Sequence, residues 1–193
     1  MPKLNKFNLV YIYKILKLIT RPYNEDAPPW CPYFFELVKE GNLIEAFQNN
    51  KQKVLGLIGS IPFAKEEFKY DPDKWSIKDV FIHMNDTERF YSYRAFCSSR
   101  KMDIDLEFDP NQDIYARNSN AVDRTLEDIA EEFAAVREAS ISLFTTMNDD
   151  MLDFKGFPNK MVYTARSLGW MTVGHNIHHC NIIEEKYLKS GLH

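Results

Sequence analysis

The stretch Gly174-His175-Asn176-Ile177-His178-His179 lies in a long apolar run near the C-terminus and contains three of the chain's five histidines. An α-helix advances about 100° per residue, so His175 and His179 lie about 40° apart on one helical face. His178 lies about 60° to the other side of His175. Two imidazoles at positions i and i+4 can bind one metal ion, because neighbouring turns bring their ring nitrogens together.

A pair of histidines does not make a stable metal site, so another part of the chain must supply a third ligand. Outside the cluster the chain has only His83 and His193, and His193 is its last residue. His83 is therefore the candidate for the third ligand. A lone histidine on a helix is more often a packed or surface residue, and that alternative stays open for His83.

The composition is that of one ordinary globular domain. The chain has 193 residues, of which 45% are apolar and 27% are charged, and this length suffices to bury a sizeable core. The formal net charge of -4 gives no electrostatic reason to expect a nucleic-acid partner. The three cysteines form no CxxC pair, which favours a reducing, cytoplasmic environment over a disulfide framework.

The N-terminal segment differs from the rest of the chain. Residues 1–21 contain five basic residues and no acidic one, and a helix would gather the basic residues on one face. We expect a helical extension on the surface, at a membrane interface or against a partner subunit. Its longest uncharged run is too short to span a bilayer. Residues 1–32 are thus predicted to be this extension plus a proline-rich linker, and residues 33–193 the functional domain.

Four long amphipathic helices are predicted in the functional domain. They cover Leu43 to Ile58, Ile77 to about Ser98, Thr125 to about Met147, and the residues after Thr164 up to about Lys189. The connection over residues 100–124 is long enough to cross the length of a bundle. The pattern therefore predicts an all-α four-helix bundle, a fold in which metal sites form from inward side chains on facing helices.

Several stretches of the chain resemble DinB-like proteins. The resemblance covers residues 33–189, and the stretches that match the second and last helices of that superfamily are Trp75-Ser76-Ile77-Lys78, His83, Thr87-Glu88-Arg89, Arg94, Gly174 to His179, Asn181-Ile182-Ile183 and Tyr187-Leu188. The resemblance implies an up-down-down-up four-helix bundle that is frequently a homodimer. It also implies a divalent metal ion, often zinc or nickel, bound by His83, His175 and His179, with His178 outside the ligand set. Relatives with known activities include thiol-dependent S-transferases and a thiol-dependent isomerase.

Three neutral imidazoles leave an open position on zinc, an arrangement typical of catalytic sites. Water or a thiol at that position would become a nucleophile at neutral pH. Asp86 and His178 are the candidates to orient a ligand or relay a proton, and Arg94 is a further candidate to recognise an anionic substrate, because helical phase places them near the ligand face.

The hypothesis is thus a metal-dependent S-transferase that uses a low-molecular-weight thiol, or a hydrolase. One alternative is a non-catalytic, dimerising bundle whose metal site is structural or vestigial. Another is a domain that acts through the basic N-terminal segment, by docking at a membrane or a partner.

Overall fold

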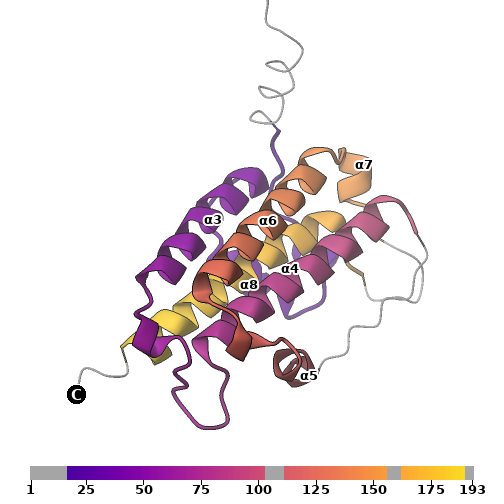
Figure 1. Ribbon diagram of the computed structural model, residues 1–193. Coiled ribbons are helices and arrows are strands. Elements are labelled where there is room, and N and C mark those ends of the chain that lie inside the picture. Colours follow the sequence, from indigo (N-terminus) through magenta and orange to yellow (C-terminus); the bar gives the residue numbers. More distant parts are fainter. Residues whose placement is uncertain (1–16, 103–110, 156–161, 190–193) are drawn as a thin grey trace, which may run out of the picture.

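The computed structural model describes residues 17–102, 111–155 and 162–189. Its long helices are α3 (Leu43–Ser60), α4 (Ile77–Ser99), α6 (Leu126–Thr145) and α8 (Ala165–Ile182). Figure 1 shows the four helices aligned side by side. No strand occurs in the described parts of the chain. The predicted all-α four-helix bundle is therefore confirmed.

Short helical elements fill the connections. They are η1 (Asn24–Asp26), α2 (Cys31–Leu37), η2 (Phe63–Lys65), α5 (Gln112–Arg117), η3 (Ala121–Asp123), α7 (Asp149–Leu152) and η4 (Ile183–Leu188), a π-helical continuation of α8. Within the described residues, no helix has the length and apolar character needed to cross a membrane. The predicted N-terminal helix lies, up to residue 16, outside the described residues.

The order of the helices follows from which ends meet. α4 packs against α6 and α8, and α3 packs against the same two helices, so the consecutive helices α3 and α4 lie diagonally. Lys78, near the start of α4, donates to the carbonyl of Arg124 just before α6 (2.8 Å), so α4 and α6 run parallel. Tyr187, after α8, donates to the carbonyl of Trp75 just before α4 (2.9 Å), so α8 and α4 are antiparallel. Lys65, after α3, reaches the carbonyl of Tyr187 (3.3 Å), which makes α3 parallel to α8 and gives the up-down-down-up order.

Side-chain caps set the starts of the helices where the sequence predicts them. Ser76 accepts a hydrogen bond from the Asp79 amide (3.1 Å), and the Asp79 carboxylate accepts one from the Ser76 amide (2.9 Å). Thr164 caps α8 by the same reciprocal pair of bonds with Ser167, and the Thr125 side chain caps α6 by accepting from the Asp128 amide. Such a cap stabilises a helix by about 1 kcal/mol and fixes which residue begins the first turn. It thereby fixes which side chains face the bundle interior.

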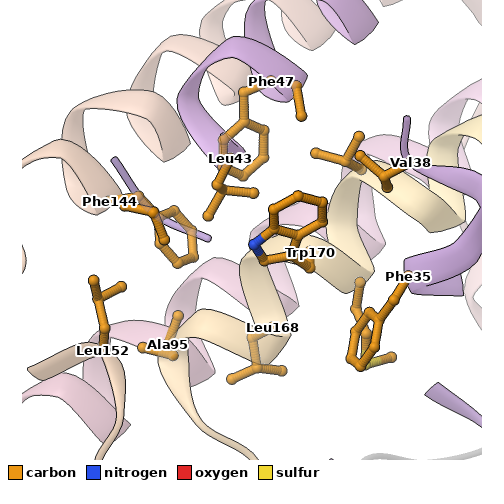
Figure 2. Close-up of a cluster of buried hydrophobic side chains, with 14 of the residues drawn as sticks. Phe35, Val38, Leu43, Phe47, Ala95, Phe144, Leu152, Leu168 and Trp170 are labelled. Atoms are coloured by element: carbon orange, nitrogen blue, oxygen red, sulfur yellow. The ribbon is translucent and has the colours of Figure 1, made fainter. Parts of the chain in front are cut away.

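One hydrophobic cluster surrounds Trp170 at the end of the bundle where α8 begins. Figure 2 shows Trp170 among side chains of α2, α3 and α8, with Phe35, Val38, Leu43 and Phe47 around it. Its indole N–H donates to the carbonyl of Thr20 (3.0 Å), so the buried ring leaves no polar atom unpaired. Residues before the predicted domain boundary at Tyr33 thus pack on the bundle, although the boundary itself stays a prediction.

A second hydrophobic cluster occupies the other end, and a polar layer separates the two. Between the apolar residues of the two clusters, each long helix contributes a buried polar residue to one hydrogen-bonded network: Asn50 on α3, Glu88 on α4, Arg137 on α6 and Asn176 on α8. Each long helix therefore contributes one member to this layer, which we call the Arg137 layer.

Arg137 links the helices through most of its guanidinium N–H groups. Its Nε and Nη2 atoms donate to the two carboxylate oxygens of Glu88, each at 2.8 Å. Its Nη1 atom donates to Asn50 Oδ1 and to the carbonyl of Phe47, both at 2.9 Å. Asn176 Nδ2 donates to Glu88 (3.2 Å) and adds α8 to the network. Because the pair is fully buried, its removal is expected to cost far more than that of a surface ion pair.

Candidate metal centre

Helices α4 and α8 provide the three predicted ligands. His83 lies on the second turn of α4, and His175 and His179 lie one turn apart on α8, which packs along α4. The Ser76 cap sets the phase of α4 so that His83 faces α8 and is only 6% exposed. His175 is equally buried, whereas His179 is partly exposed at the edge of the site.

The three Nε2 atoms converge. His175 Nε2 lies 3.1 Å from His83 Nε2 and 3.0 Å from His179 Nε2. A tetrahedral zinc ion with Zn–N bonds of about 2.0–2.1 Å places its ligand nitrogens about 3.3 Å apart. Within the described ranges, these are the only three His, Cys, Asp or Glu side chains grouped closely enough to hold a metal ion. The donor set therefore fits a divalent ion with an open coordination position.

Hydrogen bonding among the rings does not explain the arrangement well. The Nε2 atom of a neutral imidazole carries either one proton or one lone pair. It cannot complete two good in-plane hydrogen bonds at once, yet His175 Nε2 has two Nε2 neighbours at close range. One cation shared by the three lone pairs would satisfy all of them together.

Burial keeps the three imidazoles neutral, which metal binding requires. Desolvation lowers the pKa of His83 to about 4. Desolvation, with smaller effects of His83 and His178, lowers the pKa of His179 to about 2. The pKa of His175 is lowered well below its usual value, first by burial and then by the neighbouring histidines. All three lone pairs are therefore available at neutral pH.

Aromatic side chains enclose the three histidines. The ring centroid of Trp75 lies 4.8 Å from that of His83. Those of Phe34 and Tyr91 lie 6.0 and 6.1 Å from that of His175. Since apolar walls limit access of water, electrostatic interactions with an ion held by these histidines would be stronger than in bulk solvent.

Gly174 allows α2 to approach the site. A Cβ atom at this position would lie 2.1 Å from the carbonyl oxygen of Phe34 and 2.6 Å from its carbonyl carbon. Both are backbone atoms, so α2 could not avoid the clash by a side-chain rotation. Only glycine permits α2 to place Phe34 against His175.

His178 and Asp86, the predicted catalytic residues, lie in different surroundings. His178 Nδ1 is 2.9 Å from the hydroxyl of Tyr33 on α2, and its ring centroid is 5.1 Å from that of His179. Asp86 lies 3.5 Å from the Arg89 guanidinium and is not part of the three-histidine group. Burial raises the pKa of Asp86, and Arg89 opposes that shift. The catalytic roles of both residues stay predictions.

Sequence reasoning did not identify Tyr33 and Phe34 as neighbours of the histidines. Both lie on α2, before the first of the four predicted long helices, and nothing in their own spacing connects them with residue 175. The one available signal is Gly174, because a glycine inside a long helix can mark a close backbone approach. The hydroxyl of Thr87, one turn after His83 on α4, lies 3.4 Å from His83 Nδ1.

The polar layer reaches the site through Asn176, the residue after His175. Its Nδ2 atom is held by Glu88, while its buried Oδ1 atom has no partner within the described structure. His175 is thus adjacent in the chain to Asn176, the residue through which α8 joins the Arg137 layer. This connection limits how far α8 can slide relative to α4 without disturbing the ligands.

Comparison with known proteins agrees with this architecture. The sequence pattern of the DinB superfamily matches residues 46–183, a span that contains all three histidines. Among solved structures, the chain is similar to YfiT from Bacillus subtilis, described as a probable metal-dependent hydrolase with an unusual four-helix bundle topology. The two are 14% identical, the match covers 89% of this chain and 93% of YfiT, and the TM-score is 0.63. At this identity the likeness shows the fold alone. No curated protein matches the chain. Because the superfamily pattern spans most of its length, the chain belongs to the DinB superfamily.

Proposed function

We propose that the protein is a metal-dependent enzyme that binds a divalent ion, zinc or nickel, through His83, His175 and His179. The observation that carries this proposal is the convergence of three neutral Nε2 atoms without a fourth protein ligand among the described residues. Structural zinc sites are closed by four protein ligands, whereas catalytic sites keep a position for water or substrate.

A divalent ion in this site would lower the pKa of a water molecule or thiol at its open position and so supply a nucleophile at neutral pH. The residues around the site would position the reactants. Trp75 and Phe34 would limit the access of bulk water. His178, paired with Tyr33 at the rim, is proposed to relay a proton between the reaction and solvent. Asp86 is the second candidate for that role.

Two reaction classes follow from the choice of nucleophile. Water leads to a hydrolase, as YfiT is described, and a low-molecular-weight thiol leads to an S-transferase. Both need the same ligand set. The alternative is a non-catalytic bundle, acting as a homodimer, in which the ion is structural or vestigial; the partly exposed His179 and the three-ligand set argue against a closed site.

The test is activity of the full chain loaded with zinc or nickel. Hydrolysis of activated esters and conjugation of small thiols to an electrophilic fluorogenic probe would be measured side by side. We expect metal-dependent turnover in one of the two assays and a loss of about a hundredfold or more in His83→Ala, because the ion contributes several kcal/mol to transition-state stabilisation. His193→Ala is the matched histidine control, with turnover like that of the parent. Bound metal without activity in either assay would instead support the non-catalytic bundle.

A further inference from the structure

A second group of polar side chains lies next to His175, on the side away from Trp75. It consists of Tyr91 and Arg94 on α4, Tyr163 just before α8, and Cys31 on α2. Tyr91 joins this group to the site, since its ring centroid is 6.1 Å from that of His175. Arg94 lies against Tyr163, with its guanidinium carbon 4.2 Å from the ring centroid. The pKa of Tyr91 is raised by burial, by Tyr163 and by Cys31, and is lowered by Arg94.

Arg94 differs from the other arginines of the bundle. Four of the described arginines are not exposed: Arg94, Arg124, Arg137 and Arg166. Arg124, Arg137 and Arg166 each pair with a carboxylate. Arg94 pairs with no carboxylate among the described residues; its guanidinium carbon lies 4.2 Å from the ring centroid of Tyr163 and 5.7 Å from that of Phe90.

The stacking leaves Arg94 suited to bind an anion. An aromatic ring contacts the face of a guanidinium, whereas the N–H donors point outward in its plane. The ring of Tyr163 packs against the guanidinium and its hydroxyl lies within reach of it, while no carboxylate of the described residues occupies the remaining in-plane donors. Such a fork matches the two oxygens of a carboxylate.

The neighbouring groups do not neutralise this charge. Burial raises the pKa of the Cys31 thiol to about 12, and the thiol contacts Met171 (3.1 Å between sulfurs), so it stays protonated. Burial also raises the pKa of Tyr91 and Tyr163, which keeps both phenols neutral. The group thus presents one positive charge with two hydroxyl groups beside it. One charge suits a carboxylate better than a phosphate dianion, which usually needs more than one cation.

Position along the helices relates this group to the three histidines. Arg94 lies eleven residues after His83 on the same face of α4, about 16 Å along the axis. α8 runs antiparallel to α4, so Tyr163, before the start of α8, lies opposite Arg94 and His175 lies nearer His83. Tyr91 occupies the interval between them. A ligand that contacted both the three histidines and Arg94 would have to be elongated.

We propose that Arg94, with Tyr163 and Tyr91, binds the carboxylate of an elongated small-molecule substrate whose reacting group lies at the three histidines. The placement of the substrate's reacting group at the histidines rests on the proposed function. The binding of its carboxylate depends only on the Arg94 group. It narrows the substrate class to molecules that carry a carboxylate several bonds from the reacting group.

The test uses protein loaded with Co²⁺ and a series of ω-mercaptocarboxylates of increasing chain length, each matched by the ω-mercaptoalcohol of the same length. Binding of the thiolate is followed by its charge-transfer absorption. We expect the acid to bind about tenfold more tightly than the alcohol at one chain length, since a charge-assisted hydrogen-bond pair is being added. In Arg94→Met this preference should vanish while the alcohols bind as before.

Arg100→Met is the matched control, because Arg100 at the end of α4 also packs on an aromatic ring, that of Phe96, but is not part of the Arg94 group. It should retain the preference. The proposal is overturned if no chain length favours the acid, if Arg94→Met keeps the preference, or if mercaptoalkyl phosphates bind more tightly than the carboxylates.

A second measurement tests the carboxylate site independently of metal binding. Metal-free protein would be titrated with alkyl carboxylates and the matching amides while the Nε–H resonance of Arg94 is observed by NMR. A shift with the acids alone supports the carboxylate site even if no ion binds to the histidines. No shift with either series contradicts the site even if the ion does bind.

Discussion

Gly174 and His175 are adjacent in the chain, and the structure gives each a defined role at the site. The Nε2 atom of His175 lies 3.1 Å from that of His83 and 3.0 Å from that of His179. Gly174 provides the space for the α2 backbone that carries Phe34 against that imidazole. The glycine is therefore needed for the surroundings of the site rather than for its ligand set.

Gly174→Ala should destabilise the protein by about 1–3 kcal/mol, because the new methyl group would overlap backbone atoms of α2. Gly56→Ala in α3 is the control, since nothing lies within 4 Å of a Cβ atom there. That change should stabilise the protein by up to about 1 kcal/mol through helix propensity. Urea unfolding measures both free energies. Equal stabilisation by the two substitutions would contradict the close approach of α2.

For individual residues, the sequence indicated which histidines come together but not which side chains surround them. The i, i+4 spacing and the small number of histidines made His83, His175 and His179 candidates, and the resemblance to DinB-like proteins selected them over His178. The structure brings these three side chains together. Tyr33 and Phe34 could not be found in this way. Their contacts depend on how α2 lies across α8, and local periodicity contains no information about that.

At the level of helices, the Arg137 layer determines how the four long elements align. Its buried ion pair joins α4 to α6, and Asn50 and Asn176 add α3 and α8. Every member has a polar neighbour only when the helices are in register. A shift of one helix would leave a buried charge or amide unpaired, which is costly in a low-dielectric interior.

Glu88→Gln should therefore lower the free energy of unfolding by about 3–5 kcal/mol, because it leaves the Arg137 charge buried without a counter-charge. Arg137→Met should cost much less in the Glu88→Gln background than in the parent, since the two side chains act as a pair. Chemical denaturation of the parent, both single variants and the double variant completes the cycle.

Lys51→Met provides the comparison, because Lys51 forms an ion pair with Glu138, whose side chain is 62% exposed. Its loss should cost at most about 1 kcal/mol. Additive effects of the Glu88 and Arg137 substitutions, or a cost no larger than that of Lys51→Met, would show that the layer does not hold the bundle together.

The bounds of the helices were largely predictable for a local reason. The caps at Ser76, Thr125 and Thr164 involve residues only three positions apart, so a short sequence window contains the whole interaction. The predicted fourth helix extends to about Lys189, and the structure divides this span into α8 and the π-helical η4. Amphipathic periodicity does not distinguish these two hydrogen-bonding patterns.

For the molecule as a whole, the pairing of helices was not available from periodicity. His83 and His175 are separated by 92 positions, and they meet only because α4 and α8 are neighbours in the up-down-down-up order. Amphipathic stripes show that helices pack but not which pairs are adjacent. The resemblance to DinB-like proteins supplied that order, and the helix contacts and the hydrogen bonds between helix ends confirm it.

One divalent ion is proposed to be bound by histidines from two helices that are far apart in sequence. Elemental analysis of the full chain, purified without chelator and dialysed against zinc, measures this binding. We expect about one ion per chain in the parent and none in the His83→Ala, His179→Ala double variant, because one remaining imidazole cannot hold the ion. A parent protein that carries no metal and takes none up, or a double variant that binds as much as the parent, would contradict it.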